Sequence, residues 1–380
     1  MERKSNLVGL ALIAFLVFIV PAAAQNFYQI INLGVLPGGN CSLPRAINNS
    51  GVVVGDSGTC DANGFFVTTH AFMYQNCRLS DLGTLGGSQS SAQAISRQGT
   101  VVGFSSRADG AQRAFSYFQG VMTDLGGDPN LLESAFAISG WQLPVGIESA
   151  TGGLGAQGVW YFNGRAFRLP SYLLNPPSGT ANVQHVTGVN DLLQVTAALS
   201  SGQGEFGGFI GLVGAPGFGQ WTPIQGISGY PQSVPGADVI PRAININGHI
   251  AGEHDIPNPR AILSTNPNLP AVDLGTIGNQ RTISAANAIN KNDWMVGYSE
   301  YQADAGLHAF LYNGSTMIDL NNRLINGTGW NLVEATGIND NGQIVGWGSY
   351  NGQTKIAFLL TPTRSPAGIA LPCQSRVVLP

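Results

Sequence analysis

The densest run of residues with chemically useful side chains is Glu253-His254-Asp255, which places an imidazole between two carboxylates. With His185, which precedes it in the chain, the run has the nitrogen and oxygen ligands that divalent metal ions accept. Its spacing matches no metal-binding motif, so solvated loop residues are the better interpretation, and no metal or other cofactor is predicted. We expect these four residues to contact a ligand, together with the rings of Trp330 and Tyr301.

Paired carboxylates are the second chemistry to consider, because two of them about 5 to 10 Å apart can hydrolyse a glycoside. The sequence contains no G-x-S-x-G elbow, no H-E-x-x-H zinc motif and no phosphate-binding loop. No catalytic residue is therefore predicted. The candidates for a carboxylate pair, chosen by location alone, are Glu133, Glu148, Glu300 and Glu334.

These side chains must be held by a repeated unit of four phrases, D-L-G, A-I-N, V-V-G and A-F-L-Y. One copy reads DLGTLGG, AIS, VVG and RAFSY within residues 81–117. Each phrase is short, rich in β-branched or aromatic residues and bounded by Gly, Asn, Asp or Pro, which is typical of a strand. The repeat length of about 43 to 55 residues suits a four-stranded propeller blade. The A-I-N phrase recurs around Ile47, Ile95, Ile138, Val189, Ile244, Ile289 and Ile338.

The lengths of the connections predict the order of the strands within a blade. Tight turns follow A-I-N, as at 48–51, and separate A-F-L-Y from the next phrase, as at Gln119-Gly120. Two residues cannot cross from the rim of one blade to the inner edge of the next, a path of about 14 Å. The predicted order from axis to rim is therefore A-I-N, V-V-G, A-F-L-Y and D-L-G.

The two ends of the repeat region predict a closed ring. Residues 28–34 read as a rim strand that precedes the first complete blade, and the last repeat stops after its third strand at 356–360. We predict an all-β fold, a seven-bladed β-propeller of four-stranded blades over residues 25–361, with the N-terminal strand completing the last blade. An open solenoid of seven units is the alternative.

This order also predicts two different faces. Both tight turns of each blade lie at one end of the ring, the tight-turn face, so both longer connections lie at the other end, the long-loop face. Functional residues are commonly carried by loops on a rigid frame, and we expect the ligand on the long-loop face. Polar residues predicted on that face include Arg45, Asp56, His185, Glu253, Glu300 and Glu334.

The repeated polar residues are predicted to be structural. Asn at the end of A-I-N can bond its own backbone two residues on, and the Asp of D-L-G can satisfy its turn in the same way. His70 and His308 are replaced by Arg113 and Arg260 in other repeats, which does not support one shared catalytic role.

Composition and the N-terminus indicate an exported protein. Residues 1–24 read as a signal peptide, with Glu2-Arg3-Lys4, an apolar stretch at 7–20 and small residues before Gln25. The stretch is shorter than the roughly 20 residues of a membrane span, although an uncleaved anchor is the alternative. Only 10% of residues are charged and the net charge is −4, which argues against nucleic-acid and anionic-membrane partners. Residues 362–380 are predicted to be a C-terminal tail.

The phrases DLGTLGG at 81–87, His70-Ala71-Phe72 and His308-Ala309-Phe310 resemble the bacterial extracellular HAF-repeat family. The resemblance covers about residues 32–360 and weakens in the fourth and fifth repeats. It implies an exported bacterial repeat protein and no defined molecular activity. Because this chain shows no sorting tail, free secretion or the periplasm is favoured over surface attachment.

Four cysteines in an exported chain allow three disulfide pairings. Cys41 and Cys60 are both predicted on the long-loop face of the first blade. Cys77 and the tail that carries Cys373 are predicted at the opposite end of neighbouring blades. We therefore predict Cys41–Cys60 and Cys77–Cys373.

Two functional hypotheses follow. The first is a secreted or periplasmic, monomeric, non-enzymatic binding or scaffold module, whose unknown extracellular ligand is a glycan or a protein. The second is a carbohydrate-active hydrolase or lyase on a propeller frame, which rests on fold analogy alone.

Overall fold

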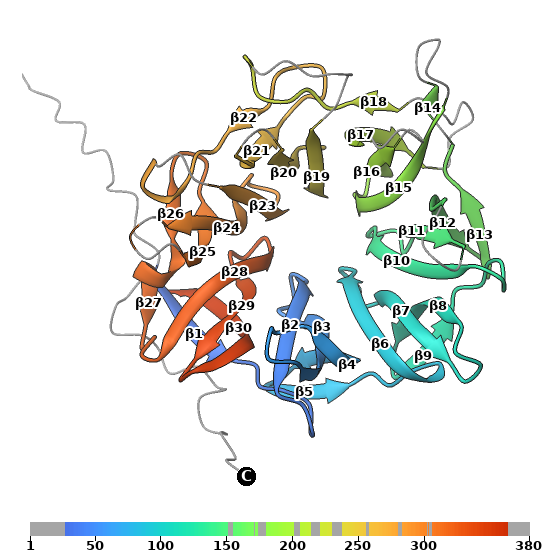
Figure 1. Cartoon of the computed structure of the whole chain (residues 1–380), viewed down its shortest axis with the longest axis horizontal. Coiled ribbons are helices and arrows are strands. Elements are labelled where there is room, and N and C mark those ends of the chain that lie inside the picture. The colour runs from blue at the N-terminus through green and yellow to red at the C-terminus, as the bar shows by residue number, and fades with distance from the viewer. Residues whose placement is uncertain are drawn as a thin grey trace, which may run out of the picture.

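The computed structural model shows strands arranged around one central axis (Figure 1). The predicted signal peptide, 1–24, and residues 364–380 of the predicted tail lie outside the described part of the chain. The described residues are 27–150, 155–170, 172–173, 180–200, 206–213, 221–229, 238–255, 258–279, 283–301, 303 and 306–363.

Seven sheets form the blades, which confirms the predicted all-β seven-bladed propeller (Figure 1). Blade 1 contains β2 (Cys41–Ile47), β3 (Val53–Cys60), β4 (Phe66–Gln75) and β5 (Arg78–Asp81), and blade 2 contains β6 (Gly86–Ile95), β7 (Val101–Arg107), β8 (Gln112–Phe118) and β9 (Val121–Asp124). Blade 3 contains β10 (Leu132–Ile138), β11 (Pro144–Ser149), β12 (Gln157–Phe162) and β13 (Arg165–Arg168). Blade 4 contains β15 (Thr180–Val189), β16 (Gln194–Ser200), β17 (Phe206–Leu212) and β18 (Thr222–Pro223), with β14 (Tyr172–Leu173) paired to β15.

Blade 5 contains β19 (Val239–Ile244), β20 (Ile250–His254), β21 (Arg260–Ser264) and β22 (Val272–Asp273), and blade 6 contains β23 (Ser284–Ile289), β24 (Met295–Tyr301), β25 (Gly306–Tyr312) and β26 (Met317–Asp319). Blade 7 contains β28 (Trp330–Ile338), β29 (Ile344–Tyr350), β30 (Gln353–Thr363) and β1 (Phe27–Asn32), with β27 (Leu324–Ile325) parallel to β1. Two short 3-10 helices, η1 (Ile277–Asn279) and η2 (Leu320–Arg323), lie in connections.

The strand order within the blades is as predicted. The A-I-N strand lies nearest the axis and the D-L-G strand lies at the rim, as in the order β2-β3-β4-β5 (Figure 1). The ring closes as predicted, because β1 pairs antiparallel with β30 from Phe27 opposite Thr363 to Asn32 opposite Phe358. The N-terminal strand thus completes the seventh blade and covers an edge that would otherwise be unpaired.

Every inner strand carries a β-bulge directly before its A-I-N phrase. In β2 the register shifts between Pro44 and Ala46, so Arg45 is the extra residue. The glycine of V-V-G lies opposite, where a Cβ on Gly55 would overlap the carbonyl oxygen of Leu43. The repeated glycine therefore makes room for the bulge, and the bulge redirects one side chain per blade.

The repeated asparagines form a hydrogen-bonded belt from blade to blade, which the sequence did not predict. Each Oδ1 accepts from its own turn, as Asn290 does from the N–H groups of residues 292 and 294 at 3.0 and 3.1 Å, which confirms the predicted local role. Each Nδ2 donates to a backbone carbonyl in the next blade. These bonds are Asn190 to Asn245 (2.9 Å), Asn245 to Asn290 (3.0 Å), Asn290 to Asn339 (3.2 Å), Asn339 to Asn48 (2.9 Å) and Asn48 to Ser96 (3.3 Å).

The H-A-F and D-L-G phrases are joined by an ion pair within blades 1, 2, 5 and 6. His70 Nδ1 lies 2.8 Å from Asp81 Oδ2, and the Asp81 Oδ1 accepts from the N–H of Gly83 at 2.7 Å. In blade 2 the Arg113 guanidinium replaces the imidazole and lies 3.4 Å from Asp124. His and Arg are thus alternative cations for one structural carboxylate, which agrees with the structural reading of these residues.

One of the two predicted disulfides lies wholly within the described residues. Cys41 and Cys60 are bonded with an S–S distance of 2.04 Å and join β2 to β3, which confirms that pair. The Cys77–Cys373 pair stays a prediction, because Cys373 lies outside the described residues; non-reducing peptide mapping tests it. No helix within the described ranges is long and apolar enough to cross a membrane.

Candidate functional site

The bulge residues supply the first functional side chains, because a bulge redirects its extra residue at the strand closest to the axis. Unlike the A-I-N phrase that follows them, they vary among the blades, although Arg and Thr each occur twice. Variation at one position of a repeated frame is expected of residues that recognise a ligand rather than hold the fold. The bulge residues of blades 1 to 7 are Arg45, Gln93, Phe136, Thr187, Arg242, Asn287 and Thr336.

Two of the bulge residues lie in a chain of polar contacts that crosses blades 5, 6 and 7. Arg242 Nη2 lies 2.7 Å from Glu253 Oε1, and Arg242 Nη1 donates to Asn287 Oδ1 at 3.2 Å. Asn287 Nδ2 donates to Glu334 Oε1 at 2.8 Å, and the indole Nε1 of Trp347 donates to Glu334 Oε2 at 2.9 Å. We call these five residues the axial cluster. Its polar atoms have fixed directions because each is held by a neighbour on a different strand.

A second polar group lies on blades 1 and 2. Arg45 Nη2 lies 2.8 Å from Asp56 Oδ2, and Ser91 donates to Asp56 Oδ1 at 2.6 Å. Burial raises the pKa of Asp56, although the charge of Arg45 and the Ser91 hydrogen bond oppose this rise. Arg45 and Asp56 occupy the same repeat positions in blade 1 as Arg242 and Glu253 in blade 5, so the two ion pairs are equivalent.

Lys355 lies between blade 1 and Trp347 of the axial cluster. Its Nζ lies 5.3 Å from the ring centroid of Phe66 and 5.8 Å from that of Trp347, and it donates to the carbonyl of Gly64. Burial and, second, the positive charge of Arg45 lower the pKa of Lys355. An ammonium between two aromatic rings is held by their quadrupoles.

Burial also changes the titration of two other groups near the axis. Burial and the negative charge of Glu253 raise the pKa of Tyr298, so the phenol stays protonated and can donate a hydrogen bond. The protein around His185 and, second, the charge of Arg242 lower the pKa of that imidazole. His185 is therefore neutral near pH 7, and its ring lies 4.7 Å from that of Phe136.

The structure separates the residues that the sequence grouped around Glu253. Glu253 joins the axial cluster, but His254 is buried and its Nδ1 accepts from the N–H of Ile227 at 3.1 Å. Successive strand residues point to opposite faces of a sheet, so these two cannot serve one site. Asp255 is exposed after β20, and its N–H donates to Asp238 at 2.5 Å. No group of His, Cys, Asp and Glu among the described residues could hold a metal ion.

The two predicted aromatic contacts pack within their own blades. The Trp330 ring lies 4.8 Å from that of Tyr350 and 6.1 Å from that of Phe358. The Tyr301 ring lies 4.9 Å from that of His308. Both rings remain partly exposed at the long-loop end of their strands. They therefore lie on the same face as the axial cluster but are not part of it.

Glu133 forms an ionic contact across blades 2 and 3, and Glu148 forms one within blade 3. Arg113 Nη2 lies 3.3 Å from Glu133 Oε2, and Arg168 Nε lies 2.5 Å from Glu148 Oε1. Burial raises the pKa of Glu133 to about 7, with Arg113 opposing the rise and Asp124 adding to it. Because the Glu133 side chain is 0% exposed, no substrate reaches this carboxyl, and the pair is not a candidate catalytic site.

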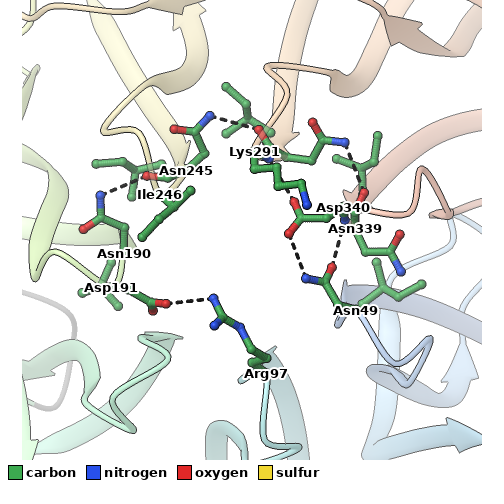
Figure 2. Close-up of a pocket in the computed structure, with 15 residues that line it drawn as sticks. Asn49, Arg97, Asn190, Asp191, Asn245, Ile246, Lys291, Asn339 and Asp340 are labelled. Atoms are coloured by element: carbon green, nitrogen blue, oxygen red, sulfur yellow. Dashed lines mark hydrogen bonds and ion pairs between the residues drawn. The ribbon is translucent and has the colours of Figure 1, made fainter.

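A cavity of about 220 Å³ lies at the other end of the axis, on the tight-turn face (Figure 2). Its wall is built from the Ile or Val and the Asn of the A-I-N phrases, and its rim from the residue after each phrase. The sequence analysis missed this site because it assigned the whole turn a structural role. The signal was present, since the residue after the A-I-N phrase varies among the blades while the phrase itself repeats. The rim residues, which we call the mouth residues, are Asn49, Arg97, Asp191, Ile246, Lys291 and Asp340.

No protein-family model and no curated protein matches the sequence. Among solved structures, the chain is similar to TolB from Acinetobacter baumannii, with 8% identity and a TM-score of 0.41 over 87% of this chain and 65% of TolB. It is also similar to the gluconolactonase XC5397 from Xanthomonas campestris, with 9% identity and a TM-score of 0.39 over 74% of this chain and 91% of that one. The Aleuria aurantia lectin bound to a fucosylated sugar shows 10% identity and a TM-score of 0.39 over 77% of this chain and 94% of the lectin. These likenesses are weak, and none carries an argument about function.

Proposed function

We propose that this chain is an exported, non-enzymatic binding module of the HAF-repeat type, whose extracellular ligand contacts the axial cluster. The observation that carries the proposal is the chain of contacts from Glu253 through Arg242, Asn287 and Glu334 to Trp347. It fixes donors and acceptors on the inner strands of three blades before any ligand arrives, and such preorganisation lowers the entropic cost of binding.

Export is supported by two independent features. The N-terminal segment reads as a signal peptide, and the Cys41–Cys60 disulfide is a bond that persists in oxidising compartments. Both fit a secreted or periplasmic protein. The repeat phrases and their shared structural roles support the HAF-repeat assignment.

Binding is favoured over catalysis by the contacts of the two carboxylates in the axial cluster. Glycoside hydrolysis needs one carboxylic acid that donates a proton and a second, free carboxylate. Glu253 instead accepts from Arg242, and Glu334 accepts from Asn287 and Trp347. Both carboxylates are therefore suited to act as fixed hydrogen-bond acceptors for a ligand.

A carbohydrate-active hydrolase or lyase is the alternative, because Glu253 and Glu334 are two carboxylates joined through Arg242 and Asn287 near the axis. A glycan and protein-ligand array combined with a polysaccharide activity screen separates the two functions. Glu253→Gln and Glu334→Gln are the informative variants, and Asp109→Asn, on an exposed loop of blade 2, is the matched control. The proposal expects weaker ligand capture by both Gln variants without any turnover. Turnover by the wild type that both variants abolish would establish the enzyme instead.

A further inference from the structure

The mouth residues are held in place by contacts that cross from blade to blade (Figure 2). Asn49 Nδ2 donates to Asp340 Oδ2 at 2.8 Å, and the N–H of Lys291 donates to Asp340 Oδ1 at 3.0 Å. On the other side, Arg97 Nη2 lies 2.9 Å from Asp191 Oδ2 and so spans from blade 2 to blade 4. The Asn belt fixes the turns beneath them. These contacts orient the donors and acceptors of Asn49, Asp340, Arg97 and Asp191 around the mouth.

The charges of the mouth residues balance. Arg97 and Lys291 supply two positive charges, and Asp191 and Asp340 supply two negative charges. Arg97 is paired with Asp191, so no cluster of free cations is present to attract a phosphate or a carboxylate. A neutral, polar ligand fits this balance better than an ion.

One arc beside the mouth is apolar and exposed. Trp141 is 74% exposed, yet its Nε1 donates to the carbonyl of Asp191 at 2.7 Å, so its ring is fixed beside the mouth. Leu192 is 58% exposed and Ile246 is 39% exposed, on the next two blades. Exposed apolar groups that form one contiguous patch mark interaction sites. The polar mouth residues Lys291, Asp340, Asn49 and Arg97, from blades 6, 7, 1 and 2, lie opposite these apolar side chains of blades 3 to 5.

The size of the cavity limits the ligand. At about 220 Å³ it is smaller than the roughly 300 Å³ at which drug-sized sites begin. A single sugar ring has the matching chemistry, because one face of a pyranose is apolar C–H surface and its edge carries hydroxyls that both donate and accept. We propose that the mouth binds one neutral sugar residue, with its apolar face on the Trp141 arc and its hydroxyls on Asp191, Asn49 and Lys291.

This site is separate from the axial cluster and does not depend on the function proposed there. The full chain without its predicted signal peptide, with the Cys41–Cys60 disulfide intact, is titrated with neutral hexoses, 6-deoxyhexoses, N-acetylhexosamines and, for comparison, uronic acids. Binding is measured by calorimetry and on a glycan array. The test variants are Trp141→Ala and Asp191→Asn. The controls are Phe162→Ala, another exposed aromatic at a tight turn, and Glu253→Gln in the axial cluster.

We expect at least one neutral sugar to bind and Trp141→Ala to weaken it by about tenfold or more, as truncation of an aromatic contact does. Asp191→Asn should weaken it as well, because a mouth acceptor is replaced and Arg97 loses its ion pair. Phe162→Ala and Glu253→Gln should bind like the wild type, and melting temperatures confirm that every variant is folded. The proposal is overturned if no neutral sugar binds, if uronic acids bind more tightly, or if Trp141→Ala and Asp191→Asn bind normally.

Discussion

Replacing Asn290 by Ala tests the hydrogen-bonded belt that joins the blades. The side chain is 4% exposed and makes three hydrogen bonds, two within its own turn and one to the carbonyl of Asn339 in the next blade. Alanine keeps the backbone conformation accessible and removes all three bonds. The change therefore removes the turn bonds and the belt bond together and leaves the packing of the apolar core intact.

The size of the effect follows from the number of bonds. A hydrogen bond contributes about 1 kcal/mol net, so three give a loss of about 3 kcal/mol in the free energy of unfolding. With an unfolding entropy of about 2.1 cal/mol/K per residue, this corresponds to a melting temperature lower by about 4 °C if the ring unfolds as one unit. Asn290→Asp keeps the acceptor but loses the donor to Asn339, so it should lose at least about 1 kcal/mol. Asn290→Ser should fall between wild type and Ala, since the equivalent Ser96 accepts one turn N–H at 3.1 Å.

Urea unfolding followed by tryptophan fluorescence measures these differences. The matched control is Asn292→Ala, two residues along the same turn, because Asn292 is exposed and only its backbone N–H is bonded to the belt residue. We expect this control to change the free energy of unfolding by less than about 0.5 kcal/mol. If Asn290→Ala costs no more than Asn292→Ala, the belt does not stabilise the ring. If Asn290→Asp matches the wild type, the bond to the next blade contributes nothing.

Three further predictions concern the rest of the ring. Replacing Cys41 and Cys60 by Ser should lower the free energy of unfolding by about 3 kcal/mol, the value that the loop-closure model gives for a sequence separation of 19. Urea unfolding measures this loss, and an unchanged free energy of unfolding would contradict the model. Burial is the main cause that raises the pKa of Glu133 from 4.5 to about 7. Between these two pH values the folded protein holds a proton that the unfolded chain releases, so the free energy of unfolding should fall as the pH rises from 4.5 to about 7. Glu133→Gln should flatten that slope when unfolding is measured at pH 5 and pH 8, and an unaltered slope would assign it to other groups. Deleting Phe27–Asn32 should expose the edge of β30 and turn a monomer into aggregates on size-exclusion chromatography; a monomer that melts like the wild type would refute ring closure by β1.

The fold could be predicted from the sequence because two independent signals agreed. The repeated phrases gave the number and type of strands, and short turns such as Gln119-Gly120 excluded every strand order but one. Closure then followed from which strands were missing at the ends. The confirmed pairing of Cys41 with Cys60 depends on the same assignment of the two faces.

The candidate site could be predicted only in part. Glu253 and Glu334 were assigned to one end of the ring, because strand ends follow from turn positions. The direction of His254 could not be predicted, since all five residues of β20 are buried and no alternation of polar and apolar residues marks its two faces. Arg242 was missed because a β-bulge, which redirects this side chain, has no signature in a single short strand.

The A-I-N phrase separates the two candidate sites along each inner strand. In blade 6 the bulge residue Asn287 comes directly before the phrase and belongs to the axial cluster, while Lys291 comes directly after it and belongs to the mouth. The phrase itself bonds its own turn and the neighbouring blade, so it is constrained by the ring. The positions on either side are not held to one residue type, since Asn287 is replaced by Arg45 in blade 1 and Lys291 is replaced there by Asn49. Repetition holds the frame, and the residues that break the repeat on each side of A-I-N are therefore the ones free to recognise a ligand.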